Sequence, residues 1–284
     1  MATDPLSTQG WPAPAKLNLF LHVTGRRPDG YHELQTVFQF LDFGDRLFFE
    51  LDESGEVRHR NPPPGVPEAE DLAVRAARAL REAAGVRAGV RIRIDKRLPL
   101  GGGLGGGSSD AATTLVVLNR LWDAGLDEER LAELGLALGA DVPVFVRGFA
   151  AWAEGVGERL LPVELEEPWY LVLVPPVTVS TAAVFSHPEL TRDSPRITIR
   201  DFLSGGGRND CEAVVRRLEP EVARALDWLG GRAPARMTGT GGCVFAPFAS
   251  EAEARRVQAE APREWRSFVA RGLNRSPLHR LLEG

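Results

Sequence analysis

A run rich in glycine stands at residues 99 to 110, which read Pro-Leu-Gly-Gly-Gly-Leu-Gly-Gly-Gly-Ser-Ser-Asp, between a strand-like and a helix-like segment. A backbone with so few side chains can wrap closely around an oxygen-rich ligand. A helix that begins directly after such a loop points unpaired N–H groups and partial positive charge toward the ligand. The run therefore predicts a phosphate-binding loop. It lacks the Gly-Lys-Ser/Thr ending of a Walker loop and the spacing of a Rossmann fingerprint, so neither of those nucleotide folds is indicated.

The composition is that of an ordinary globular protein, with 284 residues, 43% hydrophobic and 26% charged. This length allows one large or two medium domains. A net charge of −5 argues against a general nucleic-acid-binding protein. The two cysteines, Cys211 and Cys243, form no Cys-x-x-Cys motif, so neither a disulfide framework nor a protein-held metal is expected. Because the sequence contains neither a signal peptide nor an apolar run long enough to span a membrane, we expect a cytoplasmic protein that binds no membrane.

The pattern of apolar residues predicts mixed secondary structure. Alternation over 16–23 predicts a half-buried strand with Lys16 and Asn18 on one face. Residues 54–70 are polar and proline-rich and predict an exposed loop. Strands and helices mix without a regular βαβ order, which favours an α+β fold. A boundary near 155–157 divides the chain into domains 1–156 and 157–284. Further strands are expected over 34–41, 46–51, 90–94, 148–155, 170–174, 236–238, 243–246 and 266–271, and helices over 71–84, 109–123, 127–138, 209–229 and 250–260, with a short one opened by Pro143.

Lysine is rare in this chain, although lysine and arginine together number 34. The two lysines are Lys16 and Lys96, and arginine supplies every other cation. These exceptions suggest sites where a compact ammonium group matters. The alternative is that two surface lysines remain by chance.

Several motifs together resemble a known enzyme family. The run 99–110 resembles the phosphate loop of the GHMP kinases of small molecules, and Gly239-Thr240-Gly241-Gly242-Cys243-Val244-Phe245 resembles their C-terminal glycine motif. The segments Lys16-Leu17-Asn18, Gly30-Tyr31-His32, Gly139-Ala140-Asp141-Val142-Pro143 and Arg208-Asn209-Asp210-Cys211-Glu212 narrow the resemblance to one branch of that superfamily, over about residues 12–250. The resemblance implies the GHMP kinase fold, an N-terminal ribosomal-protein-S5-like domain and a C-terminal ferredoxin-like domain, with the active site in the cleft between them. It also implies a reaction of the non-mevalonate isoprenoid route, transfer of the ATP γ-phosphoryl group to the 2-hydroxyl of 4-diphosphocytidyl-2-C-methyl-D-erythritol.

The resemblance implies two catalytic residues. Asp141 matches the catalytic aspartate of the family and would take the hydroxyl proton, and Lys16 matches the catalytic lysine. Lys16 would keep Asp141 ionised and neutralise charge on the transferring phosphoryl group. From the residues alone, a helix cap before Pro143 is the favoured interpretation of Asp141, and Lys16 could be a solvated cation on a strand.

The resemblance also divides the remaining site residues between ATP and the acceptor. Lys96 would lie near the adenosine or its phosphates, and Mg²⁺ is expected with ATP. Asp71 departs from the family, because relatives carry an asparagine there that contacts adenine, and an ionised aspartate cannot donate a hydrogen bond. The backbone of the loop would hold the ATP phosphates through Pro99, Gly101, Gly102, Gly103, Leu104, Gly105, Gly106, Gly107, Ser108 and Ser109.

Tyr31 and Phe185 match the two rings that sandwich the cytosine of the acceptor, and His32 matches the residue that hydrogen-bonds its edge. Asn18 would bind the acceptor, and Gly239 would approach the transfer point. Without the resemblance, core packing would be the favoured explanation of the two rings and an incidental surface or core site that of His32, and a hairpin turn would explain Gly239.

Two other function classes stay open on the sequence. The chain could be another GHMP kinase, acting on homoserine, mevalonate or a sugar, which would not need Tyr31, His32 or Phe185. It could also be a nucleotide-binding module without catalysis, which would not need both Lys16 and Asp141. Small molecules are the expected partners of a monomer or weak homodimer, and no nucleic acid is expected.

Overall fold

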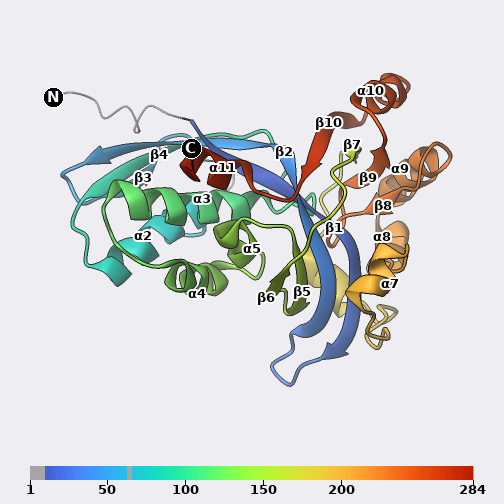
Figure 1. Cartoon of the computed structure of the whole chain (residues 1–284), viewed down its shortest axis with the longest axis horizontal. Helices are drawn as coiled ribbons and strands as arrows, with labels where there is room; N and C mark the ends of the chain where they lie inside the picture. Colours follow the sequence, from blue (N-terminus) through green and yellow to red (C-terminus); the bar gives the residue numbers. More distant parts are fainter. Residues whose placement is uncertain (1–9, 63–65, 284) are drawn as a thin grey trace.

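The computed structural model describes residues 10–62 and 66–283 and shows an elongated molecule with two lobes (Figure 1). Among the described residues, no helix has both the length and the apolar character needed to cross a membrane. The strands are β1 (Trp11–Arg26), β2 (His32–Asp52), β3 (Val57–His59), β4 (Gly89–Asp95), β5 (Ala151–Gly155), β6 (Arg159–Pro162), β7 (Trp169–Val174), β8 (Arg236–Met237), β9 (Val244–Phe248) and β10 (Arg266–Leu273). The helices are α2 (Leu72–Ala84), α3 (Gly106–Leu121), α4 (Glu128–Leu138), α5 (Val142–Arg147), α6 (Thr181–Ser186), α7 (Ile199–Leu203), α8 (Glu212–Leu218), α9 (Pro220–Gly230), α10 (Glu251–Ala259) and α11 (Pro277–Glu283).

Two long antiparallel strands, β1 and β2, run through the molecule and connect its lobes (Figure 1). The two strands predicted over 34–41 and 46–51 are in fact the single strand β2, which pairs with β1, β4, β5 and β10. The predicted half-buried strand is also wrong in its exposure, because Lys16 and Asn18 are as buried as Leu17. Other elements cover both faces of β1, and irregularities in its pairing with β2 interrupt the simple alternation.

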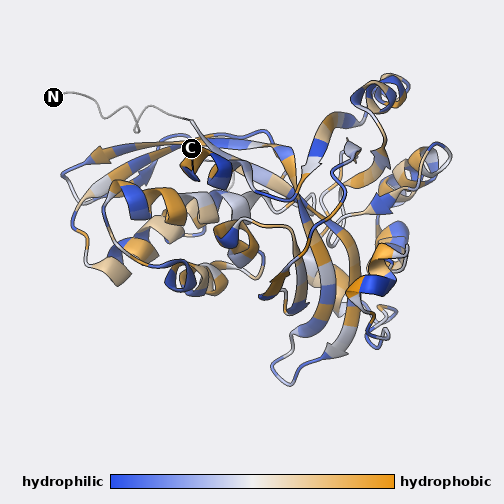
Figure 2. Cartoon of the chain, viewed as in Figure 1, coloured by the Kyte–Doolittle hydropathy of each residue, from blue (hydrophilic) through white to orange (hydrophobic). Residues whose placement is uncertain are grey.

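The first lobe places α2 to α5 on one side of the strands β2 to β4 (Figure 1). Its core includes Phe40, Phe49 and Leu115, all fully buried. Figure 2 shows hydrophobic and hydrophilic residues interleaved along these helices and strands, as expected for elements with one buried face. The predicted loop 54–70 is wrong over residues 57–59, which form β3 parallel to β4.

The second lobe packs α8, α9 and α10 on the strands β7 to β10 (Figure 1). Strand β10 pairs with β7 in this lobe and with β2 in the first, so one sheet continues through both. The helices predicted over 209–229 are α8 and α9, and Pro220 opens the second of them. Helix α11 returns to the first lobe, where Leu278 joins the core. The boundary between residues 156 and 157 stays a prediction.

Candidate active site

A cavity of about 770 Å³ lies where β1, the glycine run and the second half of the chain meet. Residues from the N-terminal strand line it together with residues from α6 and from the turn after β8. The sequence-predicted residues that line it are Lys16, Asn18, Tyr31, His32, Gly101, Gly103, Gly105, Ser108, Asp141, Phe185 and Gly239. Those that lie outside its lining are Lys96, Pro99, Gly102, Leu104, Gly106, Gly107 and Ser109.

The ammonium group of Lys16 is buried beside a carboxylate that solvent can reach. Its Nζ lies 3.0 Å from Oδ2 of Asp141, and the side chains are 3% and 34% exposed respectively. The same Nζ donates a hydrogen bond of 2.5 Å to Oδ1 of Asn18, whose Nδ2 donates to Thr36. Asp141 precedes α5 but makes no side-chain capping bond. Its carboxylate therefore faces Lys16 and the cavity, which disfavours the helix-cap interpretation.

The glycine run forms a loop that ends in helix α3. The helix begins at Gly106, three residues before the predicted start, so Gly106 to Ser109 form its first turn. The N–H groups of this first turn have few partners within the helix and lie next to a cavity that Ser108 lines. The backbone carbonyl of Leu104 accepts a hydrogen bond of 3.0 Å from the backbone N–H of Lys16. The loop before α3 and the strand β1 are therefore held together.

The loop also packs against the C-terminal glycine motif. A Cβ atom at Gly103, whose φ is +77°, would lie 2.2 Å from the backbone oxygen of Thr238. The hydroxyl of Thr238 donates to the carbonyl of Gly103 at 3.2 Å, and the N–H of Cys243 donates to the carbonyl of Gly102 at 3.1 Å. Glycine is required at Gly103 both for its backbone angle and for this close approach.

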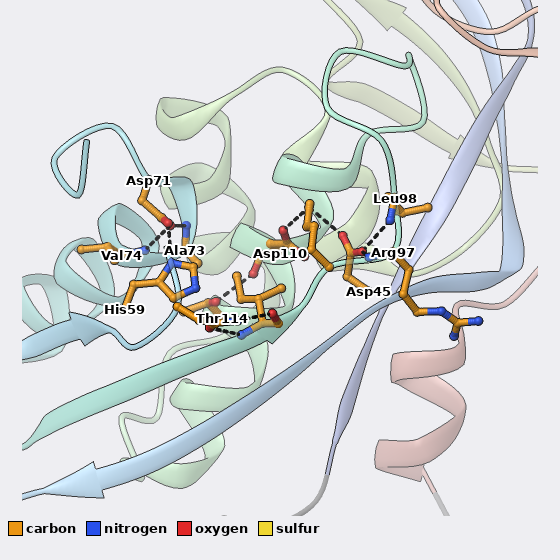
Figure 3. A network of polar contacts seen from close by, with 12 residues as sticks. Asp45, His59, Asp71, Ala73, Val74, Arg97, Leu98, Asp110 and Thr114 are labelled. Atoms are coloured by element: carbon orange, nitrogen blue, oxygen red, sulfur yellow. Dashed lines mark hydrogen bonds and ion pairs between the residues drawn. The ribbon is translucent and has the colours of Figure 1, made fainter. Parts of the chain in front are cut away.

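Lys96 belongs to a polar network with Asp45 and Asp110, which are both labelled in Figure 3. Its Nζ is 2.7 Å from Oδ2 of Asp45 and 2.6 Å from Oδ2 of Asp110. The other oxygen of Asp45 accepts hydrogen bonds from the backbone N–H groups of Arg97 and Leu98, at 2.5 and 2.8 Å. Burial alone would lower the pKa of Lys96, but the carboxylates of Asp110 and Asp45 outweigh burial and raise it. This network connects the chain before the loop to the helix after it.

Asp71 uses both of its carboxylate oxygens within the protein (Figure 3). Oδ1 accepts from the backbone N–H groups of Ala73 and Val74 at the start of α2, and Oδ2 lies 2.6 Å from Nδ1 of His59. Burial would raise the pKa of Asp71, but these hydrogen bonds outweigh burial and lower it. Asp71 is thus a helix cap paired with a buried histidine.

Aromatic residues line the other end of the cavity. The rings of His32 and Phe185 are stacked, with centroids 5.0 Å apart and planes at 24°. Tyr31 is 65% exposed at the rim. Burial lowers the pKa of His32, and the charges of Arg192 and Arg26 lower it further. A neutral imidazole, an exposed ring and a half-buried ring thus lie at one end of the cavity.

Arg192, which lines the cavity, is a site residue that sequence reasoning missed. Its Nε lies 3.2 Å from Nε2 of His32. The residue stands in a polar stretch of a chain rich in arginine, and no local pattern separates it from the other arginines.

Comparison with known proteins agrees with this geometry. Residues 71–149 match the family model "GHMP kinases N terminal domain", and residues 194–267 match "GHMP kinases C terminal". Proteins named 4-diphosphocytidyl-2-C-methyl-D-erythritol kinase from Pseudomonas paraeruginosa and Pseudomonas aeruginosa (strain LESB58) are 63% and 62% identical to this chain over 272 residues, 96% of this chain and 96% of each relative.

Solved structures confirm the predicted GHMP kinase fold. A crystal structure of a 4-(cytidine 5'-diphospho)-2C-methyl-D-erythritol kinase has a TM-score of 0.81 and 36% identity, covering 93% of this chain and 99% of that chain. A mevalonate kinase structure, with a TM-score of 0.66 and 16% identity over 94% of this chain and all of that chain, shares the fold alone. The chain belongs to the 4-diphosphocytidyl-2-C-methyl-D-erythritol kinase family of GHMP kinases.

Proposed function

We propose that this protein transfers the γ-phosphoryl group of ATP to the 2-hydroxyl of 4-diphosphocytidyl-2-C-methyl-D-erythritol, in the non-mevalonate route to isoprenoid precursors. One observation carries the proposal. The buried ammonium of Lys16 lies 3.0 Å from the accessible carboxylate of Asp141, in the cavity that also receives the glycine loop and the pair His32 and Phe185. The identity of more than 60% to proteins of this name supports the choice of substrate.

In the proposed reaction, the carboxylate of Asp141 accepts the proton of the 2-hydroxyl as that oxygen attacks the γ-phosphorus. The new oxygen–phosphorus bond forms while the bond to the β-phosphate oxygen breaks, and ADP leaves with the electron pair. Lys16 pairs with this carboxylate and faces the charge that develops on the transferring group. Positioning and electrostatics supply most of the catalysis in this class of reaction.

The first turn of α3 and the loop before it bind the ATP phosphates in this proposal. Backbone N–H groups at the start of a 16-residue helix point toward the anion, and Ser108 lies at the cavity. Lys96 acts from behind this loop, because two carboxylates already surround its ammonium. Asp71 has both oxygens engaged, so we propose no adenine contact by its side chain.

Mg²⁺ enters the proposal with ATP. Across residues 10–62 and 66–283, no group of three His, Cys, Asp or Glu side chains could hold a metal ion. The chain therefore fits a dedicated magnesium site poorly, and the phosphate oxygens and water are the more suitable ligands. No step above depends on the ion.

The acceptor half of the site lies at the aromatic end. We propose that Tyr31 and Phe185 stack on the cytosine, that His32 hydrogen-bonds its edge, and that Asn18 and Gly239 border the methylerythritol. In this structure Phe185 stacks on His32 rather than facing Tyr31, so the sandwich requires Tyr31 to move over the base. A location in the cytoplasm, a monomer or weak homodimer, and domains at 1–156 and 157–284 complete the proposal.

A phosphorylation assay tests this function. The purified protein is incubated with ATP and Mg²⁺ and with 4-diphosphocytidyl-2-C-methyl-D-erythritol, mevalonate or homoserine in parallel, and ADP release is followed. We expect turnover with the cytidine substrate and background rates with the other two. Turnover with mevalonate or homoserine in its place would refute the assignment, as would ADP release that the acceptor does not stimulate.

A further inference from the structure

The guanidinium of Arg192 is held in one orientation beside the cavity. Its Nη2 donates to the backbone carbonyls of Phe185 and His187, both at 2.8 Å, and its Nη1 donates to the carbonyl of Leu190 at 3.0 Å. Its Nε donates to Nε2 of His32 at 3.2 Å. A guanidinium carries its five N–H donors in a rigid plane, so bonds in these directions fix it against the end of α6.

This contact determines where the proton of His32 resides. Arginine has no acceptor, so Nε2 of His32 must be the acceptor. In a neutral imidazole one ring nitrogen accepts and the other carries the hydrogen, which places the hydrogen of His32 on Nδ1. Arg26 on β1 adds a second positive charge near the ring, and Phe185 covers one face without charge. These surroundings disfavour protonation of the second ring nitrogen of His32, so the ring stays neutral.

The Nδ1 atom of His32 is available to a ligand. Within the described part of the chain, no group forms a hydrogen bond with Nδ1, whereas Nε2 is engaged by Arg192. His32 and Arg192 both line the cavity, next to the exposed ring of Tyr31. The ring therefore offers one fixed donor at the aromatic end of the cavity.

We propose that Arg192 is a positioning and specificity-determining residue of the acceptor site, because it holds His32 as the neutral tautomer with its hydrogen on Nδ1. This inference deepens the proposed function and rests on it for the identity of the base. Ring atom N3 of cytosine is an acceptor, whereas N3 of uracil carries a hydrogen. A donor fixed at Nδ1 pairs with cytosine N3 and opposes uracil N3, and the other tautomer would reverse that preference.

The tautomer can be measured directly by NMR. Long-range ¹H–¹⁵N spectra of the whole protein report the protonation of both ring nitrogens, and His32→Gln identifies the His32 signals among the five histidines. At neutral pH we expect a protonated Nδ1 and an unprotonated Nε2. In Arg192→Gln we expect mixed tautomers and a higher pKa for His32. An imidazolium, or a hydrogen on Nε2, in the wild-type protein would overturn the inference.

Kinetics test the consequence for specificity, with the cytidine substrate and its uridine analogue compared in Arg192→Gln. We expect KM for the cytidine substrate to rise about tenfold, the factor that one hydrogen bond of ordinary strength supplies, and the preference for cytidine to fall by a similar factor. KM for ATP should stay within about twofold, and the acid limb of kcat/KM should move to higher pH.

The controls separate this role from a structural one. Arg200→Gln removes an exposed arginine on α7 outside the cavity. It should leave KM for the cytidine substrate and the preference for cytidine over uridine unchanged. If Arg192 merely ordered residues 185–190, KM would rise equally for both pyrimidine substrates and the pH limb would not move, which would contradict the proposal. If the wild-type protein phosphorylates neither substrate, the proposed function and the cytosine preference both fail, while the NMR result still decides the tautomer.

Discussion

At the scale of single residues, the chemistry depends on how the charge of Lys16 is compensated. An isolated ammonium is costly to bury, and this side chain is 3% exposed. Asp141 and Asn18 offset that cost, and Asp141 remains open to a bound molecule because it is 34% exposed. The arrangement places a carboxylate paired with Lys16 beside the cavity, where a bound molecule can reach it.

Asp141→Asn should abolish most turnover while ATP binding persists. An amide cannot take the hydroxyl proton, and a positioned base contributes roughly 10² to 10⁴-fold in rate. We therefore expect kcat to fall by about that factor, while Kd for an ATP analogue changes less than about threefold. Steady-state kinetics and calorimetry measure the two quantities.

Asp127→Asn is the matched control, because Asp127 caps α4 through the N–H of Arg130 and lies outside the cavity. Asparagine caps helices about as well as aspartate, so kcat should match the wild type. Near-normal turnover in Asp141→Asn would rule out Asp141 as the base.

Tyr31→Ala should weaken binding of the acceptor substrate and leave binding of ATP unchanged. A base stacked on an aromatic ring gains about 1–3 kcal/mol, so KM for the cytidine substrate should rise roughly 5- to 150-fold, with KM for ATP unchanged. Because Tyr31 is 65% exposed, thermal unfolding should stay close to that of the wild type. Tyr31→Phe keeps the ring and should behave as wild type. Equal losses for both substrates would remove Tyr31 from the pyrimidine site.

At the scale of elements, residues from three parts of the chain hold the glycine loop before α3. Asp45 comes from β2, Lys96 follows β4, and Asp110 lies in α3, and the ammonium joins the two carboxylates (Figure 3). Burial, together with the negative charge of Asp45, raises the pKa of Asp110 to about 7 against the opposing effect of Lys96. The network at the start of α3 therefore contains a carboxyl group whose pKa lies well above its usual range.

This raised pKa predicts a pH-dependent stability. An aspartate in the unfolded chain loses its proton at about pH 4. Between about pH 4 and about pH 7, the folded protein therefore binds up to one proton more than the unfolded chain. The free energy of unfolding contributed by Asp110 is therefore largest at low pH and falls as the pH rises through this interval. Asp110→Asn removes the titration, so its stability relative to wild type should increase from about pH 5 to about pH 8.

Urea unfolding across that pH range measures the difference. Asp95→Asn replaces an exposed carboxylate of β4 outside this network and serves as the control. A stability difference for Asp110→Asn that stays constant or shrinks as the pH rises would contradict a proton held at Asp110.

At the scale of the whole molecule, the cavity exists because the two glycine motifs meet. The loop before α3 and the turn after β8 are in backbone contact through Gly103 and Thr238, and β10 extends one sheet from β2 to β7. Both halves of the chain therefore contribute walls to the same cavity. A change at this contact should disturb ATP binding and stability together.

Gly103→Ala should show this coupling. The new Cβ would lie 2.2 Å from the oxygen of Thr238, so the loop and the turn must separate. Gly125→Ala is the matched control, because its φ is +69° but nothing lies within 4 Å of the new Cβ. The control should lose only about 1–2 kcal/mol of unfolding free energy to backbone strain. Gly103→Ala should lose more and raise KM for ATP at least about tenfold. If Gly103→Ala and Gly125→Ala had the same effect on thermal unfolding and on KM for ATP, the contact between Gly103 and Thr238 would contribute to neither stability nor ATP binding.

Prediction from the sequence succeeded where local patterns are long. The helices α2, α3, α4 and α10 follow apolar periodicity and caps such as Asp71 and Ser250. It failed for β3, α6, α7 and α11, which are three to seven residues long, because such segments span too little of a period to be distinguished from loops. The prediction also split β2 into two strands at residues 42–45. In the structure the strand continues through Gly44, whose backbone packs against Ala13 of β1, and no local pattern encodes that contact.

The sequence by itself determined which residue types are present for the proposed chemistry: a glycine loop suited to phosphates, a lysine and an aspartate suited to phosphoryl transfer, and rings suited to a base. Such motifs can be recognised in the sequence because each needs particular residue types at fixed spacing. Only the tertiary structure decided which groups meet. In the structure Lys96 lies between two carboxylates, and Asp71 forms a hydrogen bond with His59. Arg192 forms a hydrogen bond with His32, although the two residues are 160 positions apart in the sequence. Contacts of this kind arise from the packing of distant segments, and no local residue pattern specifies them.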